Sequence, residues 1–329
     1  MIGRFCAGIS CVLLLSSTCW AIDVARGDVS AFIDSMVSGH GYDRAELEAI
    51  LSEADSQASI IEKISKPAEK TKTWGEYRLI FLTDERIGAG AAFWRENRET
   101  LEGISRETGV PIEILVGILG VETYFGRITG GHRVLDALVT LAFDYPPRSR
   151  FFTRELEEFL LLVREEDMEA TAAVGSYAGA MGRPQFMPSS FRAYAVDSTG
   201  DGKRDIWTDW ADAAGSVANY MLRHGWRRGE DITVEATLGE RWQGPLPENR
   251  LQPEDTVGSL SERGVIFLTA LPQDSAGHLL TLEGAEGPEY WVGFHNFFVI
   301  TRYNRSVMYA LAVHQLGQAI AMEVDRGAS

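Results

Sequence analysis

The sequence predicts a mainly α-helical protein of the α+β class, with a small β-rich subdomain near its C-terminal end. Apolar residues recur at spacings of three and four through most of the chain before residue 225. After Gly229 the pattern changes to short β-favouring segments separated by Gly, Pro, Asn and Asp. A helical pattern returns over residues 306–324. At 329 residues, the chain can form one large domain or two smaller ones.

The predicted helices follow one another with short connections, and Gly, Pro or polar residues mark their ends. They cover residues 29–37, 43–54, 84–108, 111–125, 135–143, 150–165, 212–224 and 306–324. The predicted strands cover residues 232–238, 264–268, 278–282 and 289–293, and the pattern of residues 297–300 also favours a half-buried strand. The polar stretch 66–72, which contains Pro67, is expected to be a linker.

The N-terminal segment has the features of a cleaved export signal. Arg4 supplies a positive charge, residues 11–15 are apolar, and Ala21 ends a small-residue cleavage site. All three cysteines fall inside this segment, at Cys6, Cys11 and Cys19. We therefore expect a periplasmic protein without disulfides. Acylation of Cys19 is the alternative, but the polar residues directly before Cys19 are unfavourable for a lipoprotein signal.

The chain is strongly acidic, with a formal net charge of −16 at pH 7 and its charges dispersed along the sequence. Removal of the leader with Arg4 makes the charge one unit more negative. This composition argues against nucleic acid or an anionic membrane surface as a partner. The apolar leader is too short for a good membrane span, so we expect no transmembrane span in the mature chain.

Glu122 is a carboxylate within an apolar helical run, residues 111–125. It lies one turn after Ile118 on the apolar side, where desolvation should raise its pKa. The helix end expected at Gly126 acts in the same direction through the helix dipole. A carboxyl group that stays protonated near neutral pH is what a general acid needs. The structural alternative is an ion pair, for example with Arg127, or a side chain turned to solvent.

Residues 176–190 combine several glycines with a glutamine and two prolines. Glycines allow the backbone to approach a ligand closely. Gln185 and Ser176 offer hydrogen bonds to a polar ligand such as a sugar. Composition alone favours the structural alternative, a tight loop-to-helix junction capped by Ser189 or Ser190.

The spacing of oxygen side chains in residues 197–212 matches a calcium loop. The oxygen ligands would come from Asp197, Thr199, Asp201, Asp205 and the Lys203 carbonyl, with Gly202 at the sharp turn. Position 12 of such a loop, which normally supplies a bidentate Glu ligand, is Thr208 here. Asp209 or Asp212 could replace that ligand only if the loop is longer. The alternative is an acidic turn held by Asx hydrogen bonds. The spacing favours a structural Ca²⁺.

Residues 296–309 are rich in aromatic side chains that stack well on sugar rings. Tyr303, Asn304 and Tyr309 add hydrogen-bonding groups. Other chemistries lack their residues: the six histidines have no metal-ligand spacing, no cysteine follows the leader, and no phosphate-binding glycine loop is present. No cofactor is therefore expected for the chemistry.

Six segments, in order, resemble the lytic murein transglycosylases of the B type. They are residues 117–127, 135–146, 176–197, 215–226, 296–305 and 314–319, and the first reads GILGVETYFGR and the third begins SYAGAMGRPQFMP. The resemblance spans most of the chain after the leader. It implies a lysozyme-like catalytic core with additional helical and small β-rich subdomains. It also implies periplasmic peptidoglycan glycan strands as substrate, and leaves open which proteins of cell-wall synthesis or hydrolysis are partners.

On this resemblance we divide the chain into five segments. They are a signal peptide (1–21), an N-terminal helical region (22–72), the catalytic core with the calcium loop (73–229), the β-rich subdomain (230–295) and a C-terminal segment that completes the cleft (296–329).

The resemblance also implies roles for individual residues. The family's catalytic acid falls on Glu122. The substrate-binding residues fall on Ser176, Gln185, Tyr303, Asn304 and Tyr309, and an upstream tyrosine on Tyr77. Family members can carry two arginines after the Tyr-Pro turn, but here only Arg148 is retained, because Pro147 precedes it. The calcium ligands fall on Asp197, Thr199, Asp201, Lys203 and Asp212.

The implied reaction needs one carboxylate. Glu122 would donate a proton to the oxygen of the β-1,4 bond between N-acetylmuramic acid and N-acetylglucosamine, then accept the proton of the muramic acid 6-hydroxyl, which forms a 1,6-anhydro sugar. Glycoside hydrolases commonly need two carboxylates. The alternatives are a hydrolytic muramidase, with Asp144 or another acid as the second carboxylate, and a non-catalytic wall-binding protein.

Overall fold

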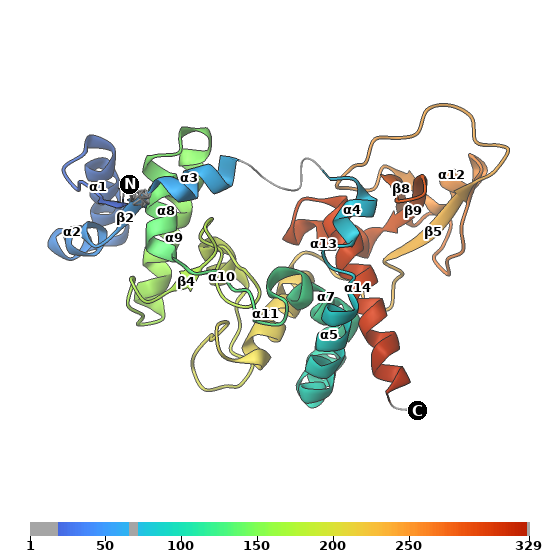
Figure 1. Cartoon of the computed structure of the whole chain (residues 1–329), viewed down its shortest axis with the longest axis horizontal. Coiled ribbons are helices and arrows are strands. Elements are labelled where there is room, and N and C mark those ends of the chain that lie inside the picture. The colour runs from blue at the N-terminus through green and yellow to red at the C-terminus, as the bar shows by residue number, and fades with distance from the viewer. Residues whose placement is uncertain (1–18, 66–71, 328–329) are drawn as a thin grey trace, which may run out of the picture.

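The computed structural model describes residues 19–65 and 72–327, and it is mainly α-helical with small antiparallel sheets (Figure 1). The predicted fold class is confirmed. Most of the predicted leader, with Arg4, Cys6 and Cys11, and most of the predicted linker, with Pro67, lie outside the described residues.

The N-terminal segment contributes three helices and a strand pair. These are α1 (Gly27–His40), α2 (Arg44–Ser52), α3 (Ala58–Ser65), β1 (Cys19–Ala21) and β2 (Asp55–Gln57). Two later helices, α8 (Val134–Phe143) and α9 (Ser149–Glu165), lie beside them (Figure 1). Asp136 of α8 fixes this packing, because its carboxylate accepts hydrogen bonds from Asp55 N and Gln57 Nε2, both at 3.1 Å. Residues 19–65 therefore pack on a segment from the middle of the chain.

The remaining helices gather around α7 (Ile112–Thr123) and α14 (Val307–Arg326), and most residues of α7 are buried. They are α4 (Trp74–Arg78), α5 (Asp84–Glu96), α6 (Arg98–Thr108), α11 (Trp210–Arg223) and α13 (His295–Tyr303). The short helix α10 (Pro188–Tyr194) packs on both α9 and α11 and so connects the two groups of helices (Figure 1).

A five-stranded antiparallel sheet in the order β6-β8-β9-β5-β7 forms the β-rich part. Its strands are β5 (Thr233–Leu238), β6 (Asp255–Thr256), β7 (Val265–Ile266), β8 (Ala276–Glu283) and β9 (Pro288–Phe294), and α12 (Val257–Glu262) packs against it. This part has its own small core, which includes Leu260, Leu279 and Phe294. A separate two-stranded pair joins β3 (His132–Arg133) to β4 (Val174–Gly175).

The turn between β8 and β9 packs against α4. Glu289 accepts a hydrogen bond from Trp74 Nε1 at 3.0 Å and lies 3.6 Å from Arg78 Nη1. A Cβ on Gly75 would lie 2.7 Å from the Ala285 amide nitrogen, so this approach requires glycine. The sheet therefore supports the helix that carries Tyr77.

Two predictions of secondary structure are wrong. The expected single helix over residues 84–108 is two helices, because Asn97 has φ −110° and ψ 20° and its Nδ2 donates to the Phe93 carbonyl at 2.9 Å. Residues 297–300 belong to α13 and not to a strand. Their β-favouring side chains are buried against α14 and α11, so tertiary packing overrides local propensity.

The expected cap of α10 is also wrong. Its N-cap residue is Met187, without a side-chain hydrogen bond. Ser189 instead bonds with both its amide and its hydroxyl to the buried carboxylate of Glu155, at 3.0 and 2.8 Å. Burial raises the pKa of Glu155, and these hydrogen bonds partly offset that rise.

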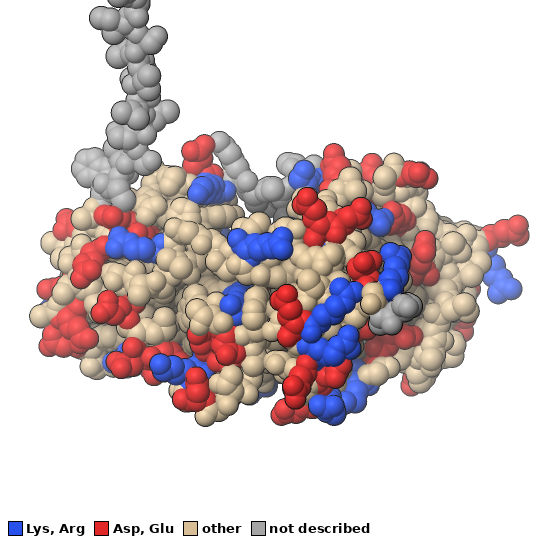
Figure 2. Space-filling model, turned by 60° about the horizontal axis from the view of Figure 1, so that its bottom comes forward, with Lys and Arg blue, Asp and Glu red and all other residues tan. Residues whose placement is uncertain are grey.

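Acidic and basic side chains are interspersed over the face in Figure 2. No single-sign patch dominates that face, in agreement with the dispersed charges of the sequence. Among the described residues, no helix combines the length and the apolar character needed to cross a bilayer.

Helices α7 and α14 cross at two glycines. A Cβ on Gly117 would lie 2.3 Å from the Val313 carbonyl oxygen, and one on Gly317 would lie 2.0 Å from the Glu113 carbonyl oxygen. Real Cβ atoms do not approach oxygen so closely, so any larger residue would push the helices apart. The crossing therefore fixes where α14 lies on α7.

We expect Gly117→Ala to lower the free energy of unfolding by about 1–3 kcal/mol, because the new methyl group meets backbone that cannot rotate away. Urea denaturation measures the change. Gly103→Ala is the matched control, since Gly103 lies within α6 with nothing within 4 Å of the added methyl, and it should be neutral or slightly stabilising. Equal stability of the two variants would contradict the tight crossing.

Candidate active site

Glu122 lies at the C-terminal end of α7 and accepts a hydrogen bond from Tyr309 of α14. The distance from the Tyr309 hydroxyl to Glu122 Oε1 is 2.6 Å. Tyr309 is 1% exposed, whereas Glu122 is half-buried. Ser306 caps α14 and accepts from the Tyr309 amide at 3.2 Å, which fixes the start of the helix. The structure therefore joins two residues that the sequence singled out separately.

Tyr303 is the second phenol at this site. Its ring lies parallel to that of Tyr309, with centroids 6.4 Å apart and an interplanar angle of 8°. Its hydroxyl donates to the Pro184 carbonyl at 2.6 Å. Phe186 and Tyr220 contact the ring from other sides, with centroids at 5.8 and 4.8 Å. These contacts fix Tyr303 between the glycine-rich loop and α11.

Both phenols are held in their neutral form. Burial raises the pKa of Tyr303 and of Tyr309 well above 10, and the negative charge of Glu122 raises each further. Tyr309 therefore keeps its proton at any working pH and acts as a permanent hydrogen-bond donor to Glu122. Such a donor stabilises the ionised carboxylate.

Gln185 and Ser176 hold the shape of the glycine-rich loop. Gln185 has a φ of 52°, and its Nε2 donates to the carbonyls of Thr129 and Gly182, at 3.1 and 2.8 Å. The Ser176 hydroxyl accepts from the amides of Ala178 and Ala180, at 3.2 and 3.1 Å. Their predicted role in sugar binding remains a prediction.

Thr123 connects α7 to this loop, and the sequence analysis did not identify it. Its hydroxyl donates to the Arg183 carbonyl at 2.9 Å, one residue before the carbonyl that Tyr303 binds. The same hydroxyl accepts from the Gly126 amide at 3.2 Å. The sequence feature that could have identified Thr123 is its position directly after the candidate acid, Glu122.

The turn after Glu122 is strained. The helix ends at Tyr124, not at Gly126 as expected, and Tyr124, Phe125 and Gly126 have φ values of 51°, 55° and 77°. Positive φ at two successive non-glycine residues is costly and is often found at functional sites. Arg127, the ion-pair candidate, lies with its guanidinium 4.7 Å from the Tyr124 ring centre.

Tyr77 and Asn304 lie close to this cluster. Tyr77, on α4, is 3% exposed, and its charge contributes to the raised pKa of Tyr309. Asn304 follows Tyr303 directly and ends α13. The structure thus gathers Glu122, Tyr303 and Tyr309 beside the loop that contains Pro184 and Gln185.

Asp144 and Arg148 are held in other contacts. Asp144 accepts from Arg26 Nη1 at 2.8 Å and from the Ser56 hydroxyl at 2.5 Å, so it anchors the N-terminal segment. Arg148 is exposed at the end of a 3₁₀ turn (Pro146–Arg148), and its guanidinium lies 4.5 Å from the Phe151 ring centre. Their contacts do not include the tyrosine cluster around Glu122.

The predicted calcium loop is closed by hydrogen bonds to its carboxylates. Asp197 accepts from the amides of Gly200 and Gly202 at 2.6 and 2.7 Å, and Asp201 accepts from the Lys203 amide at 2.9 Å. In residues 19–65 and 72–327, no three His, Cys, Asp or Glu side chains converge as metal ligands. These Asx hydrogen bonds are those expected of the alternative, an acidic turn without a metal. The carboxylate oxygens that accept them are also hard ligands of the kind that calcium prefers.

Asp212 joins the two ends of this loop. It is 1% exposed, and its two oxygens accept from Ser198 N and Asp205 N, at 2.7 and 2.8 Å. Burial raises its pKa, and the charges of Asp209 and Asp197 add to the rise. Thr199 donates to Asp197 at 3.2 Å, and so belongs to the same set of contacts.

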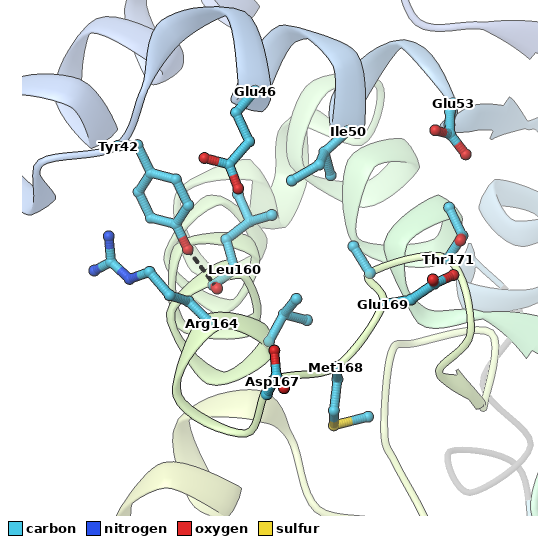
Figure 3. A pocket seen from close by; sticks show the side chains of 12 residues that line it. Tyr42, Glu46, Ile50, Glu53, Leu160, Arg164, Asp167, Met168, Glu169 and Thr171 are labelled. Carbon is cyan, nitrogen blue, oxygen red and sulfur yellow. Dashed lines mark hydrogen bonds between the residues drawn. The ribbon is translucent and has the colours of Figure 1, made fainter.

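A cavity of about 450 Å³ lies away from Glu122, between α2 and the end of α9 (Figure 3). Tyr42, Glu46 and Arg164 line one side, and Asp167 and Glu169 line the other. No predicted site residue lines it, so it is separate from the candidate active site.

His314 is a buried histidine on α14, five residues after Tyr309. It is 8% exposed, and burial lowers its pKa from 6.5 to about 4. Its imidazole is therefore neutral in the folded protein over the whole physiological range.

A model of the family described as transglycosylase SLT domain matches residues 25–318 of this chain. Membrane-bound lytic murein transglycosylase B of Escherichia coli (strain K12) is 43% identical over 300 residues, which are 88% of this chain and 82% of that protein. Both similarities extend over most of the chain and include the candidate active site.

Solved structures are also similar. Lytic transglycosylase SltB1 from Pseudomonas aeruginosa superposes with a TM-score of 0.86 at 48% identity, over 91% of this chain and 98% of that one. The Escherichia coli lytic transglycosylase Slt35, solved in complex with calcium, superposes with a TM-score of 0.82 at 41% identity, over 93% and 96% of the two chains.

We expect the buried His314 to weaken the fold in acid. Between pH 6.5 and 4 the unfolded chain binds a proton at this position and the folded chain does not, so the free energy of unfolding falls as the pH falls. Relative to His314→Gln, the wild type should lose about 2–3 kcal/mol between pH 7.5 and 4.5. Denaturation at both pH values, with His295→Gln as control, measures this; a constant difference would refute it.

Proposed function

This chain belongs to the family of lytic murein transglycosylases with an SLT domain, and on that premise we propose the chemistry of its reaction. The proposed reaction cleaves the β-1,4 bond between N-acetylmuramic acid and N-acetylglucosamine in peptidoglycan and leaves a 1,6-anhydromuramoyl end. The observation that supports it best is the contact of Glu122 with a permanently neutral phenol, Tyr309, while Asp144 is held by Arg26 and Ser56.

In the first step Glu122 acts as a general acid. Its carboxyl proton moves to the glycosidic oxygen, the bond from that oxygen to C1 of the muramic acid breaks, and N-acetylglucosamine leaves as an alcohol. The positive charge that develops at C1 needs nearby dipoles or the substrate's own acetamido group. Tyr309 stabilises the carboxylate that remains, because its hydroxyl donates to Oε1.

In the second step the same carboxylate acts as a base. It takes the proton of the muramic acid 6-hydroxyl while that oxygen bonds to C1, which closes the anhydro ring and returns Glu122 to its acid form. No water is consumed, so the site needs no second carboxylate, whereas hydrolysis commonly uses one. A half-buried Glu that retains a hydrogen-bond donor suits both protonation states.

The other predicted residues would bind the glycan around Glu122. Tyr77, Tyr303, Asn304 and Tyr309 supply phenol and amide groups, and Gln185 and Ser176 maintain the loop that faces them. We keep Arg148 as a candidate for an anionic stem peptide farther along the strand. We also propose that the chain divides into segments after residues 72, 229 and 295.

We propose a periplasmic location on the sugar chemistry and on the leader-like N-terminal sequence. The Escherichia coli relative is named as membrane-bound. Of the candidate leader positions, Cys19 and Ala21 lie within β1, paired with β2. The two alternatives predict different N-termini for the mature protein: Cys19 if that residue is acylated, and Ile22 if the leader is cleaved after Ala21.

We propose that residues 197–212 bind a structural Ca²⁺ through Asp197, Thr199, Asp201, the Lys203 carbonyl and Asp212. The oxygen donors fit calcium, and the related Slt35 was solved in complex with calcium. Calcium would neutralise carboxylates that are crowded in one loop. The chemistry at Glu122 would not require it.

We expect Glu122→Gln to lower the rate of peptidoglycan lysis by about 10²- to 10⁴-fold, because it removes the proton that the leaving group needs. Mass spectrometry of the wild-type digest should show 1,6-anhydromuramoyl ends. Glu113→Gln, in the first turn of the same helix, is the matched control and should retain activity.

Two results would overturn this chemistry. Reducing muramic acid ends in the wild-type digest would indicate a hydrolytic muramidase. Undiminished lysis by Glu122→Gln, with its stability unchanged, would remove Glu122 from the role of acid.

We expect millimolar Ca²⁺ to raise the melting temperature of the protein relative to a chelator, because a ligand that binds only the folded state adds about 2.7 kcal/mol at 100 times its Kd. Asp201→Asn keeps the acceptor for the Lys203 amide but removes a charge, so it should shrink the shift. Asp274→Asn, on an exposed residue outside the loop, should leave it intact. A wild-type melting temperature that does not change when Ca²⁺ is added would contradict the proposed site.

A further inference from the structure

Arg183, in the glycine-rich loop, has a side chain that the proposed reaction does not use. Its guanidinium carbon lies 3.6 Å from the centre of the Trp210 ring, at the start of α11, so the two groups are in direct contact. Its Nη1 atom is buried and has no hydrogen-bond partner within the described residues. Burial of a guanidinium whose donors are not all satisfied costs free energy. An arginine kept at this position despite that cost points to a role for its contacts.

Two carboxylates before α11 help to keep Arg183 charged. Asp205 and Asp209 act electrostatically on its guanidinium and oppose the lowering of its pKa by burial. The Arg183 amide donates to the Ile206 carbonyl at 2.9 Å, which holds the loop backbone against the same segment. Among aromatic side chains, the indole of Trp offers the best face for a cation. The stack of Arg183 on Trp210 is therefore fixed both by charge and by the backbone.

The turn that follows Glu122 lies against this stack. A Cβ on Gly126 would lie 3.3 Å from the Trp210 ring and 3.6 Å from Arg183 Nε, so the backbone of the turn contacts both groups. The hydroxyl of Thr123 donates to the Arg183 carbonyl at 2.9 Å. This hydrogen bond uses the backbone of Arg183, so substitution of its side chain leaves the bond possible. Any effect of such a substitution on Glu122 must then pass through the stack.

Two phenylalanines complete the support of this turn. Phe93 of α5 meets the Trp210 ring with centroids 4.5 Å apart, and it stacks on Phe125 with centroids 5.3 Å apart. Phe125 has a φ of 55° and is the second of three successive residues with positive φ. A backbone in this conformation persists only where its surroundings impose it. The rings and the guanidinium supply that constraint within four residues of Glu122.

We propose that the Arg183 side chain is a positioning residue for Glu122, because it presses Trp210 against Gly126 and so holds the strained turn that aligns the acid; the proposal rests on the function proposed above. Arg183 takes no part in the proton transfers themselves. The carboxylate must reach the glycosidic oxygen and then the 6-hydroxyl, so a small displacement slows both transfers. The effect therefore falls on kcat and not on KM.

The test measures kcat and KM for the cleavage of soluble glycan strands. Arg183→Met keeps the length of the side chain but not its charge or its planar group. We expect kcat to fall about tenfold with KM unchanged, because misplaced catalytic groups lose rate without losing substrate. Arg183→Lys restores the charge without the planar group, so its kcat should recover to about threefold below the wild type.

The matched control is a second arginine–tryptophan pair, in the β-rich part. The Arg263 guanidinium carbon lies 4.8 Å from the centre of the Trp242 ring, and its Nη1 also pairs with Asp255. Arg263→Met therefore removes the same kind of contact outside the site. We expect it to retain the wild-type kcat.

A double-mutant cycle distinguishes positioning from general stability. Trp210→Leu removes the ring on which Arg183 stacks, and it should lower kcat by a similar factor. Because the guanidinium acts through the indole, Arg183→Met should lower kcat by less than about twofold in the Trp210→Leu background. Melting temperatures measured in parallel establish that each variant is folded during the assay. If Arg183→Met does not fold, Arg183→Lys, alone and combined with Trp210→Leu, decides.

Three outcomes would overturn the proposal. One is an unchanged kcat in folded Arg183→Met, and another is a raised KM with kcat unchanged, which would make Arg183 a substrate-binding residue. The third is a set of independent losses in the double mutant, or an equal loss in Arg263→Met, because the arginine would then not act through Trp210. Undiminished lysis by Glu122→Gln would instead remove the proposed function, and it is measured separately from the Arg183 variants.

Discussion

The crossing of α7 and α14 is the constraint on which the site depends. Gly117 and Gly317 let each helix touch the backbone of the other, at Val313 and Glu113. This contact sets the height of α14 along α7, and with it the position of Tyr309 against Glu122. Because burial raises the pKa of Tyr309 well above 10, the phenol keeps its proton and donates to Glu122 near neutral pH. A larger residue at either glycine would meet the backbone of the other helix, so it would shift the two helices that carry Glu122 and Tyr309.

A second set of hydrogen bonds makes the surroundings of Glu122 rigid. Thr123 donates to the Arg183 carbonyl and Tyr303 donates to the carbonyl of the next residue, Pro184. The glycine-rich loop is thereby bonded to α7 on one side and to α13 on the other. Gln185 closes the loop from within. Rigid placement of this kind suits the proposed reaction, in which Glu122 would serve first as acid and then as base.

Most helices and the main strands followed from apolar spacing and turn residues, and Glu122 stood out because it was a charge in an apolar run. The failures have physical causes. Residues 297–300 favour a strand locally, but burial between helices makes them helical. Asn97 interrupts a long helical pattern through one side-chain bond to the backbone. The partners of Asp144 and the stacking of Arg183 on Trp210 depend on contacts between separate segments, so periodicity carries no signal for them.

The bond between Tyr309 and Glu122 joins residues that are 187 positions apart in the chain. Contacts of such long range form late in folding, because the loop between them must close first. A chain that has been synthesised only as far as α13 holds the acid, the loop and Tyr303, but not the phenol that engages the acid. Glu122 therefore gains this hydrogen-bond donor only when α14 docks. For a lytic murein transglycosylase, this order would delay the proposed chemistry until α14 has docked.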